Sequence, residues 1–281
     1  MATPALAALL WHGSFPPPQV IALGLITAFA GYTAVYALND LMDYHIDARR
    51  VADGLLPDKQ PDLDSIFIRH PLAYGLLPVK MGVYWTVVWT ATALMGSYLL
   101  NPVCVVIFLG SFLLETIYCL MWKSSWLKVL ISGAVKSSGA LAAVFAVDPQ
   151  PSLIPLSMLF LWLFFWEIGG QNIPNDWADI EEDRILQATT IPVRFGPELA
   201  NGAIFVSLLL AVMLSGIIMS FLPVETRFAG VTAFLGIGVY LLLIPAYRLY
   251  RARGRRQALA LFNSASYYPL TLLAVIIIAC L

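Results

Sequence analysis

Two copies of one acidic pattern are the part of this chain best suited to chemistry. Residues 39–47 and 175–183 both read N-D-x-x-D-x-x-x-D, and each copy follows a long apolar run. Carboxylates at i, i+3 and i+7 share one face of a helix, and they repel one another unless a cation lies between them. Hard cations such as Mg²⁺ bind carboxylate and phosphate oxygens, so two facing motifs would bind metal ions and a diphosphate. The carboxylates concerned are Asp40, Asp43, Asp47, Asp176, Asp179 and Asp183.

The composition places these motifs in a membrane protein. Of the 281 residues, 60% are hydrophobic and 12% are charged, against roughly 25% charged residues in an average soluble protein. Mean hydropathy is +0.80. The formal net charge of −1 gives no reason to expect a nucleic acid as partner. We predict an all-α polytopic membrane protein, with one membrane domain over residues 1–281 and lipids around it.

The apolar runs predict a bundle of nine transmembrane helices. A spanning helix needs about 20 mostly apolar residues. The first run, Met1–Trp11, is too short, so we expect helix 1 to be short or truncated. The eight full spans are predicted at Val20–Ala37, Met81–Leu100, Pro102–Trp122, Leu127–Val147, Ser152–Gly170, Asn201–Leu222, Phe228–Leu249 and Ala258–Leu281.

The charged loops predict the orientation. All of the 16 lysines and arginines except Lys136 and Arg227 follow the second, fourth, sixth or eighth helix. These loops share one face, which the positive-inside rule assigns to the cytosol. The two Asp-rich motifs open the longest of them, and we expect cytosolic caps over residues 39–80 and 171–200.

The matching places of the two motifs suggest an internal duplication, in which helices 2–5 correspond to helices 6–9. Interrupted segments at matching places in two pseudo-repeated halves indicate a site between the halves. The alternative is that both motifs are ordinary solvated loops. The nine-residue pattern recurs at the same position relative to its helix, which argues against that alternative.

These features together resemble the UbiA superfamily of intramembrane prenyltransferases. Its members have nine transmembrane helices, an NDxxDxxxD motif after helix 2 and a related motif after helix 6. The segment Thr190–Gly196 and the pair Tyr118 and Lys123 also look like family features. The chain departs from the family in its short first helix. It also departs in the Arg-Pro turn after motif one, whose nearest match, Arg69–Gly75, follows an acidic insertion at 51–68, so that a longer cap is expected.

The resemblance implies transfer of a prenyl group from its diphosphate to an acceptor. Each Asp-rich motif would hold one Mg²⁺, which Mn²⁺ could replace, and the ions would neutralise the departing diphosphate. The apolar chain would lie in a channel within the membrane, away from water. The residues expected to bind substrate are Asn39, Asn175, Tyr118, Lys123, Arg49, Arg184, Glu167 and Asn172.

Three charged residues lie within or close to the ends of predicted spans: Glu115, Lys136 and Glu167. Such charges usually face the interior of the bundle. Glu115 and Lys136 could form a structural ion pair or bind the acceptor, and Glu167 could hold or deprotonate the acceptor. An acceptor with a carboxylate would need a cation, and Lys136 could supply it only if it faces the cavity without being neutralised by Glu115. We therefore expect a neutral aromatic acceptor.

The function we predict is Mg²⁺-dependent prenyl transfer to a lipophilic acceptor, either aromatic or a quinone precursor. A related enzyme could use a glycerol lipid, a tetrapyrrole or a sugar phosphate instead, or could cyclise the prenyl chain itself. Outside this class, the carboxylates could serve a divalent-cation transporter. Transporters keep acidic residues near the membrane midplane, whereas these aspartates follow the ends of apolar runs, which disfavours transport.

Overall fold

The protein is described here by a computed structural model that covers residues 2–52, 70–221 and 227–281. Within these ranges every regular element is helical. The elements are α1 (Ala2–His12), α2 (Pro18–Ala52), α3 (Val79–Leu100), α4 (Pro102–Met121), α5 (Lys128–Val147), α6 (Leu153–Trp166), η2 (Glu167–Asn172), α7 (Ile173–Ala178), α8 (Ile180–Ile185), α9 (Ile191–Phe221), α10 (Arg227–Gly238), η3 (Val239–Leu243), α11 (Ile244–Ala252) and α12 (Arg255–Cys280).

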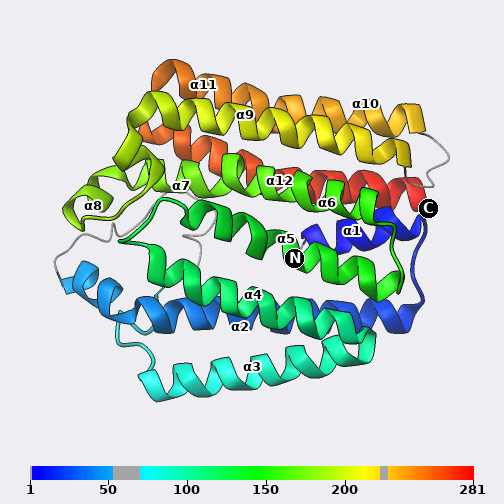
Figure 1. Cartoon of the computed structure of the whole chain (residues 1–281), viewed down its shortest axis with the longest axis horizontal. Helices are drawn as coiled ribbons and strands as arrows, with labels where there is room; N and C mark the ends of the chain where they lie inside the picture. The colour runs from blue at the N-terminus through cyan, green and yellow to red at the C-terminus, as the bar shows by residue number, and fades with distance from the viewer. Residues whose placement is uncertain (1, 53–69, 222–226) are drawn as a thin grey trace.

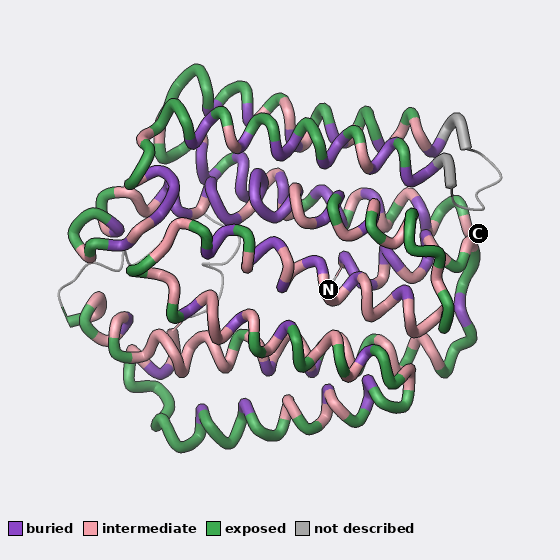
Figure 2. Tube along the Cα trace, in the orientation of Figure 1, coloured by how far each residue is buried: buried purple, intermediate pink, exposed green. Residues whose placement is uncertain are grey.

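Eight helical stretches in the described chain are long and apolar enough to cross a membrane. They coincide with the eight predicted spans, so the all-helical membrane fold is confirmed. The outer faces of these helices are apolar: Val87 and Met95 of α3, for example, are exposed. Figure 2 shows the buried residues concentrated between the helices and the exposed ones along the outer helices, as expected of a bundle surrounded by lipid.

The short helix α1 belongs to the interior of the bundle. It packs against both α5 and α12, and its Leu6 and Leu10 are almost completely buried. In Figure 1, α2 to α5 form one side of the molecule, α6 to α12 form the other, and α1 lies between them. This arrangement is compatible with two repeated halves, which remain a prediction.

Two predicted boundaries differ from the structure. The second span was expected to end at Ala37, but α2 continues through the first Asp-rich motif to Ala52. Hydropathy marks where the apolar core ends, and polar residues extend a helix beyond it without interruption. Residues 171–200, predicted as a cap, are largely helical in α7, α8 and the start of α9. Residues 53–68 of the predicted insertion, and Arg69 at the start of the predicted turn, lie outside the described residues.

Candidate active site

The two Asp-rich motifs meet at one end of the bundle. In Figure 1, the end of α2 lies at the same end of the molecule as α7 and α8. Arg50 links the motifs directly: its Nη1 is 3.3 Å from Oδ1 of Asp47, and its Nη2 is 4.0 Å from Oδ1 of Asp183. The two acidic faces, far apart in the chain, therefore form one site.

The first motif lies on the uninterrupted helix α2. Asp40, Asp43 and Asp47 follow one another at the predicted spacing of three and four residues, which stacks them on one side of the helix. Asp47 is almost completely buried. The predicted helical face is therefore present for this copy of the pattern.

His70 completes the first half of the site. Its Nδ1 lies 2.8 Å from Oδ2 of Asp47 and 3.7 Å from Oδ1 of Asp40. Burial would lower the pKa of this imidazole, but its close approach to the two carboxylates and their attraction outweigh burial and raise the pKa to about 9. At neutral pH His70 is therefore a cation between two predicted metal ligands. The sequence analysis included His70 in a turn segment without giving it a role.

The second motif lies on an interrupted helix. The π-helical turn η2 precedes it, and a Cβ on Gly169 would lie 2.9 Å from the carbonyl oxygen of Ile204, so glycine permits this close approach to α9. The helix then ends at Ala178 and restarts at Ile180, with Asp179 between α7 and α8 at φ −104° and ψ 15°. The second copy of the pattern therefore does not lie on one regular helix as predicted.

A buried lysine supports the second motif. Nζ of Lys128, at the start of α5, lies 2.9 Å from Oδ1 of Asp176 and 5.3 Å from the centre of the Tyr118 ring. Tyr118 in turn accepts a 3.3 Å hydrogen bond from Nδ2 of Asn172. Lys128 is 2% exposed, whereas Lys123, which the family resemblance favoured, is exposed and lies over Trp122.

Two aspartates of the second motif, Asp179 and Asp183, lie outside the membrane spans. Asp183 is the more buried of the two, with 3% of its surface exposed. Burial and repulsion by Asp176 raise the pKa of Asp183 to about 7, although Lys128 and Arg50 oppose the shift. A buried carboxyl with a raised pKa needs a cation to hold its charged form at neutral pH.

The carboxylates fit a divalent cation. One side-chain atom each of Asp40, Asp47 and His70 lies within 4.8 Å of the other two, and His70 would have to lose its proton to act as a ligand. Oδ1 of Asp40 is buried and has no hydrogen-bond partner in the described part of the chain. Unpaired buried carboxylate oxygens are costly, and hard cations such as Mg²⁺ prefer oxygen ligands of this kind. In the structure the charges of His70, Arg50 and Lys128 offset the carboxylates instead.

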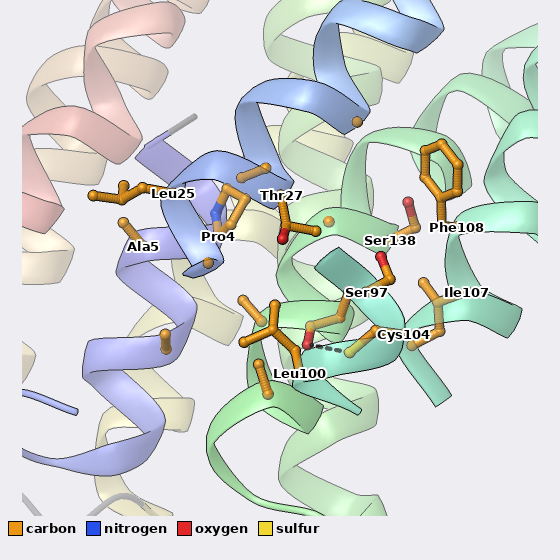
Figure 3. A pocket seen from close by; sticks show the side chains of 18 of the residues that line it. Pro4, Ala5, Leu25, Thr27, Ser97, Leu100, Cys104, Ile107, Phe108 and Ser138 are labelled. Atoms are coloured by element: carbon orange, nitrogen blue, oxygen red, sulfur yellow. Dashed lines mark hydrogen bonds between the residues drawn. The ribbon is translucent and has the colours of Figure 1, made fainter. Parts of the chain in front are cut away.

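An apolar cavity of about 270 Å³ is lined by residues of α1, α2, α3, α4 and α5. Figure 3 shows its wall, to which α1 contributes Pro4 and Ala5, α2 contributes Leu25 and Thr27, and α4 contributes Phe108. Tyr36 and Lys136 line the cavity as well. On α2, Tyr36 is about one helical turn from Asp40, so the cavity leads toward the acidic site.

Comparisons with known proteins identify the family. Residues 1–267 match the sequence model of the UbiA prenyltransferase family. The chain belongs to this family. A curated relative, digeranylgeranylglyceryl phosphate synthase of Thermococcus kodakarensis, is 22% identical over 254 residues, which cover 90% of this chain and 83% of the relative.

Solved structures of UbiA homologues share the fold. The apo homologue from Aeropyrum pernix K1 has a TM-score of 0.76 at 17% identity, covering 99% of this chain and 95% of that one. The homologue from Archaeoglobus fulgidus bound to DMAPP and Mg²⁺ has a TM-score of 0.71 at 16% identity, covering 99% and 94%. The resemblance inferred from the motifs is confirmed, and this UbiA-family chain is a prenyltransferase.

The other residues predicted to bind substrate in this UbiA prenyltransferase differ in their burial and in their contacts. Asn39 donates to Oε1 of Glu115 and to Sγ of Cys119, and Glu167 accepts a 2.8 Å hydrogen bond from Ser132. Asn175 is half-buried beside Asp176, whereas Arg49 is exposed. Arg184 is also exposed, and it pairs with Glu181 at 3.0 Å.

Like His70, the site cations Arg50 and Lys128 were not predicted from the sequence. Arg50 lies three residues after Asp47, and that spacing on a helix could have indicated the contact. Lys128 contacts Asp176, which is far away in the sequence, and no local pattern indicates this pair.

Proposed function

We propose that this protein transfers a prenyl group from a prenyl diphosphate to a lipophilic acceptor in a reaction that depends on Mg²⁺. The observation that carries the proposal is the meeting of the two Asp-rich motifs, linked by Arg50, at the end of an apolar cavity. Prenyl diphosphates combine a strongly anionic head with an apolar tail. A cation-binding site above an apolar cavity is complementary to both parts.

The comparisons support the same substrate class. Structures of the homologue from Archaeoglobus fulgidus are described as bound to DMAPP and Mg²⁺, and to GPP and Mg²⁺. In this chain Asp40, Asp43, Asp47 and Asp176 are buried or half-buried and would hold Mg²⁺ in this proposal. Asp179 and Asp183 complete the second half of the proposed site.

The residues around the site perform three tasks in this proposal. The carboxylates hold Mg²⁺, which when bound supplies Lewis-acid neutralisation of the leaving diphosphate. Arg50, Lys128 and His70 place positive charge beside the carboxylates and are available for phosphate oxygens. The apolar wall of the cavity holds the prenyl chain and keeps water away from the allylic carbon.

We infer that the site faces the cytosol. The basic residues gather near the motif end of the bundle: Arg50, Lys128, Arg253 and Arg255 contact acidic groups or the backbone there. By the positive-inside rule this end is cytosolic. A cysteine-labelling assay on intact cells tests the orientation. A single cysteine replaces the exposed Glu181, and its labelling from outside the cell would contradict a cytosolic site.

The activity is tested by diphosphate release from protein purified in detergent. The reaction contains GPP or geranylgeranyl diphosphate, Mg²⁺ and a panel of acceptors, with EDTA and Asp43→Ala as negative controls and Glu198→Gln, an exposed residue of α9, as a matched control. Release that needs both metal and acceptor supports prenyl transfer. Release without any acceptor would indicate cyclisation, and no release with any chain length would favour ion transport over the proposed function.

The acceptor has two candidate classes. The sequence analysis favoured an aromatic or quinone-precursor ring. The similarity to digeranylgeranylglyceryl phosphate synthase, over 90% of this chain, favours a glycerol lipid as the second candidate. The acceptor panel therefore contains phenolic rings and prenylated glycerol lipids side by side.

A further inference from the structure

The apolar cavity has one charged side chain among its described lining residues, and this side chain is Lys136. The rest of the wall consists of apolar, small and hydroxyl-bearing side chains, including Ala28, Gly31 and Ser138. Charged groups inside a membrane bundle are costly and usually have a function or a partner. A lysine in such a wall selects what the cavity accepts.

Lys136 lies at the end of the cavity nearest the Asp-rich motifs. The lining residues of α5 run from Val135 and Lys136 to Val147, and the helix starts at Lys128 in the acidic site. Lys136 follows Lys128 by eight residues, or about 12 Å along the helix axis. A diphosphate held at Asp176 and Lys128 would therefore lie a helical turn or more above Nζ of Lys136.

The contacts of Lys136 leave it able to bind an anion. Nζ donates a 3.1 Å hydrogen bond to the hydroxyl of Tyr36 and lies 4.9 Å from the centre of that ring. Glu115 and Glu167 attract it electrostatically. Glu115 also accepts a hydrogen bond from Asn39, and Glu167 accepts one from Ser132. An ammonium group has three donors, of which the contact with Tyr36 uses one.

We propose that Lys136, together with Tyr36, binds an anionic group of the acceptor, either a carboxylate or a phosphate. This inference rests on the proposed function and names the class of acceptor. The apolar part of the acceptor would lie in the cavity, and its nucleophile would lie between Lys136 and the acidic site. Lys136 meets the first part of the condition stated from the sequence, because it faces the cavity. Glu115 attracts Lys136 electrostatically, but Glu115 is hydrogen-bonded to Asn39 while Lys136 is hydrogen-bonded to Tyr36. The proposed anionic acceptor differs from the neutral aromatic acceptor expected from the sequence.

Binding of matched acceptor pairs tests the inference without turnover. The probes are 4-hydroxybenzoate with its methyl ester, and a prenylated glyceryl phosphate with the corresponding alcohol. Their affinities are measured on detergent-purified protein by intrinsic tryptophan fluorescence, without prenyl diphosphate. In at least one pair, the wild type should bind the anionic member at least about tenfold more tightly, as expected of a charge-assisted hydrogen bond. The pair that shows the preference identifies the carboxylate or the phosphate.

Variants assign the preference to Lys136. Lys136→Met should reduce the preference to about one, Lys136→Arg should retain most of it, and Tyr36→Phe should weaken it only in part. Lys80→Met, at an exposed lysine of α3, is the matched control and should match the wild type. If Lys136→Met does not fold, Lys136→Arg and Tyr36→Phe still test the site. Equal binding within both pairs by the wild type, or an unchanged preference in Lys136→Met, would overturn the inference.

Turnover separates this inference from the proposed function. If the wild type releases diphosphate with neutral acceptors only, prenyl transfer stands and the role of Lys136 fails. If it binds the anionic probe through Lys136 but releases no diphosphate with any acceptor, the proposed function fails while the anion site stands.

Discussion

The two Asp-rich motifs share one sequence pattern but are built differently. The first lies on the continuous helix α2, and its partners His70 and Arg50 are partly exposed, at 23% and 17% of their side-chain surface. The second follows a π-helical turn, is interrupted at Asp179, and pairs with the buried Lys128. Equal ligand spacing is therefore supported in two different ways. The first motif relies on partly exposed contacts on and beside one helix, and the second relies on a buried, long-range contact in a tightly packed region.

The largest effect should come from removing one predicted metal ligand from either motif. Asp43→Ala and Asp176→Ala should each lower diphosphate release by at least about 10²-fold, in line with the loss of a single electrostatic stabiliser in other enzymes. The assay is the Mg²⁺-dependent release described above, with Glu198→Gln as control. Full activity of either variant would show that the two motifs do not act as one site.

The supporting cations should differ in their effect on stability. Lys128→Met leaves Asp176 buried without its partner, and loss of one member of a buried ion pair costs about 3–5 kcal/mol. Arg50→Met removes a partly exposed contact and should cost less. Thermal unfolding in detergent with EDTA measures both. Equal losses would contradict the distinction between a buried and a partly exposed contact.

The tightness of packing should also differ between η2, which precedes the second motif, and α2, which carries the first. A Cβ on Gly169 would lie 2.9 Å from a backbone oxygen of α9, so Gly169→Ala should destabilise the second motif by about 1–3 kcal/mol. On α2, a Cβ on Gly31 would meet Phe108 at an ordinary 3.6 Å, and Gly31→Ala should change stability little. The same unfolding assay compares the two variants. A larger loss in Gly31→Ala would reverse the assignment of the more tightly packed region.

A pH dependence with one window for each motif is also expected. His70 has a pKa raised to about 9, so the stability it contributes to the metal-free protein is complete below about pH 6.5 and is lost as pH rises toward 9. The pKa of Asp183 is raised to about 7, so the folded state binds the proton more tightly and stability falls as pH rises from about 4 to 7. Unfolding temperatures should fall by a few degrees in each window.

Single variants separate the two windows. Asp183→Asn should remove the lower one and His70→Gln the upper one, when thermal unfolding is followed in EDTA across the pH range. If both windows persist in both variants, the titrating groups lie elsewhere.

The sequence predicted the helices and the six carboxylates because both are local signals. Apolar runs of membrane length located all eight spans, and two repeats of one spacing predicted which carboxylates lie together. The extension of α2 to Ala52 was missed because hydropathy reports the membrane core and not the end of a helix. The interruption at Asp179 was missed because no glycine or proline at or beside this position marks it in the sequence.

The choice of cations at the site was also beyond what the sequence could predict. Of two adjacent arginines, Arg49 is exposed and Arg50 contacts Asp47, a difference set by helical phase. Of two nearby lysines, Lys123 is exposed and Lys128 is buried against Asp176. Only the fold brings α5 beside α7, so composition and spacing could not choose between the two lysines.

The contact of Arg50 with Asp183 also sets an order for biosynthesis. Asp47 and Arg50 leave the ribosome together and can pair as soon as α2 forms. Asp183 is synthesised much later, after α3 to α7, and domains fold as their segments emerge. The nascent first half of the chain therefore holds only half of the acidic site, and the two motifs can meet only after the second half has been inserted into the membrane.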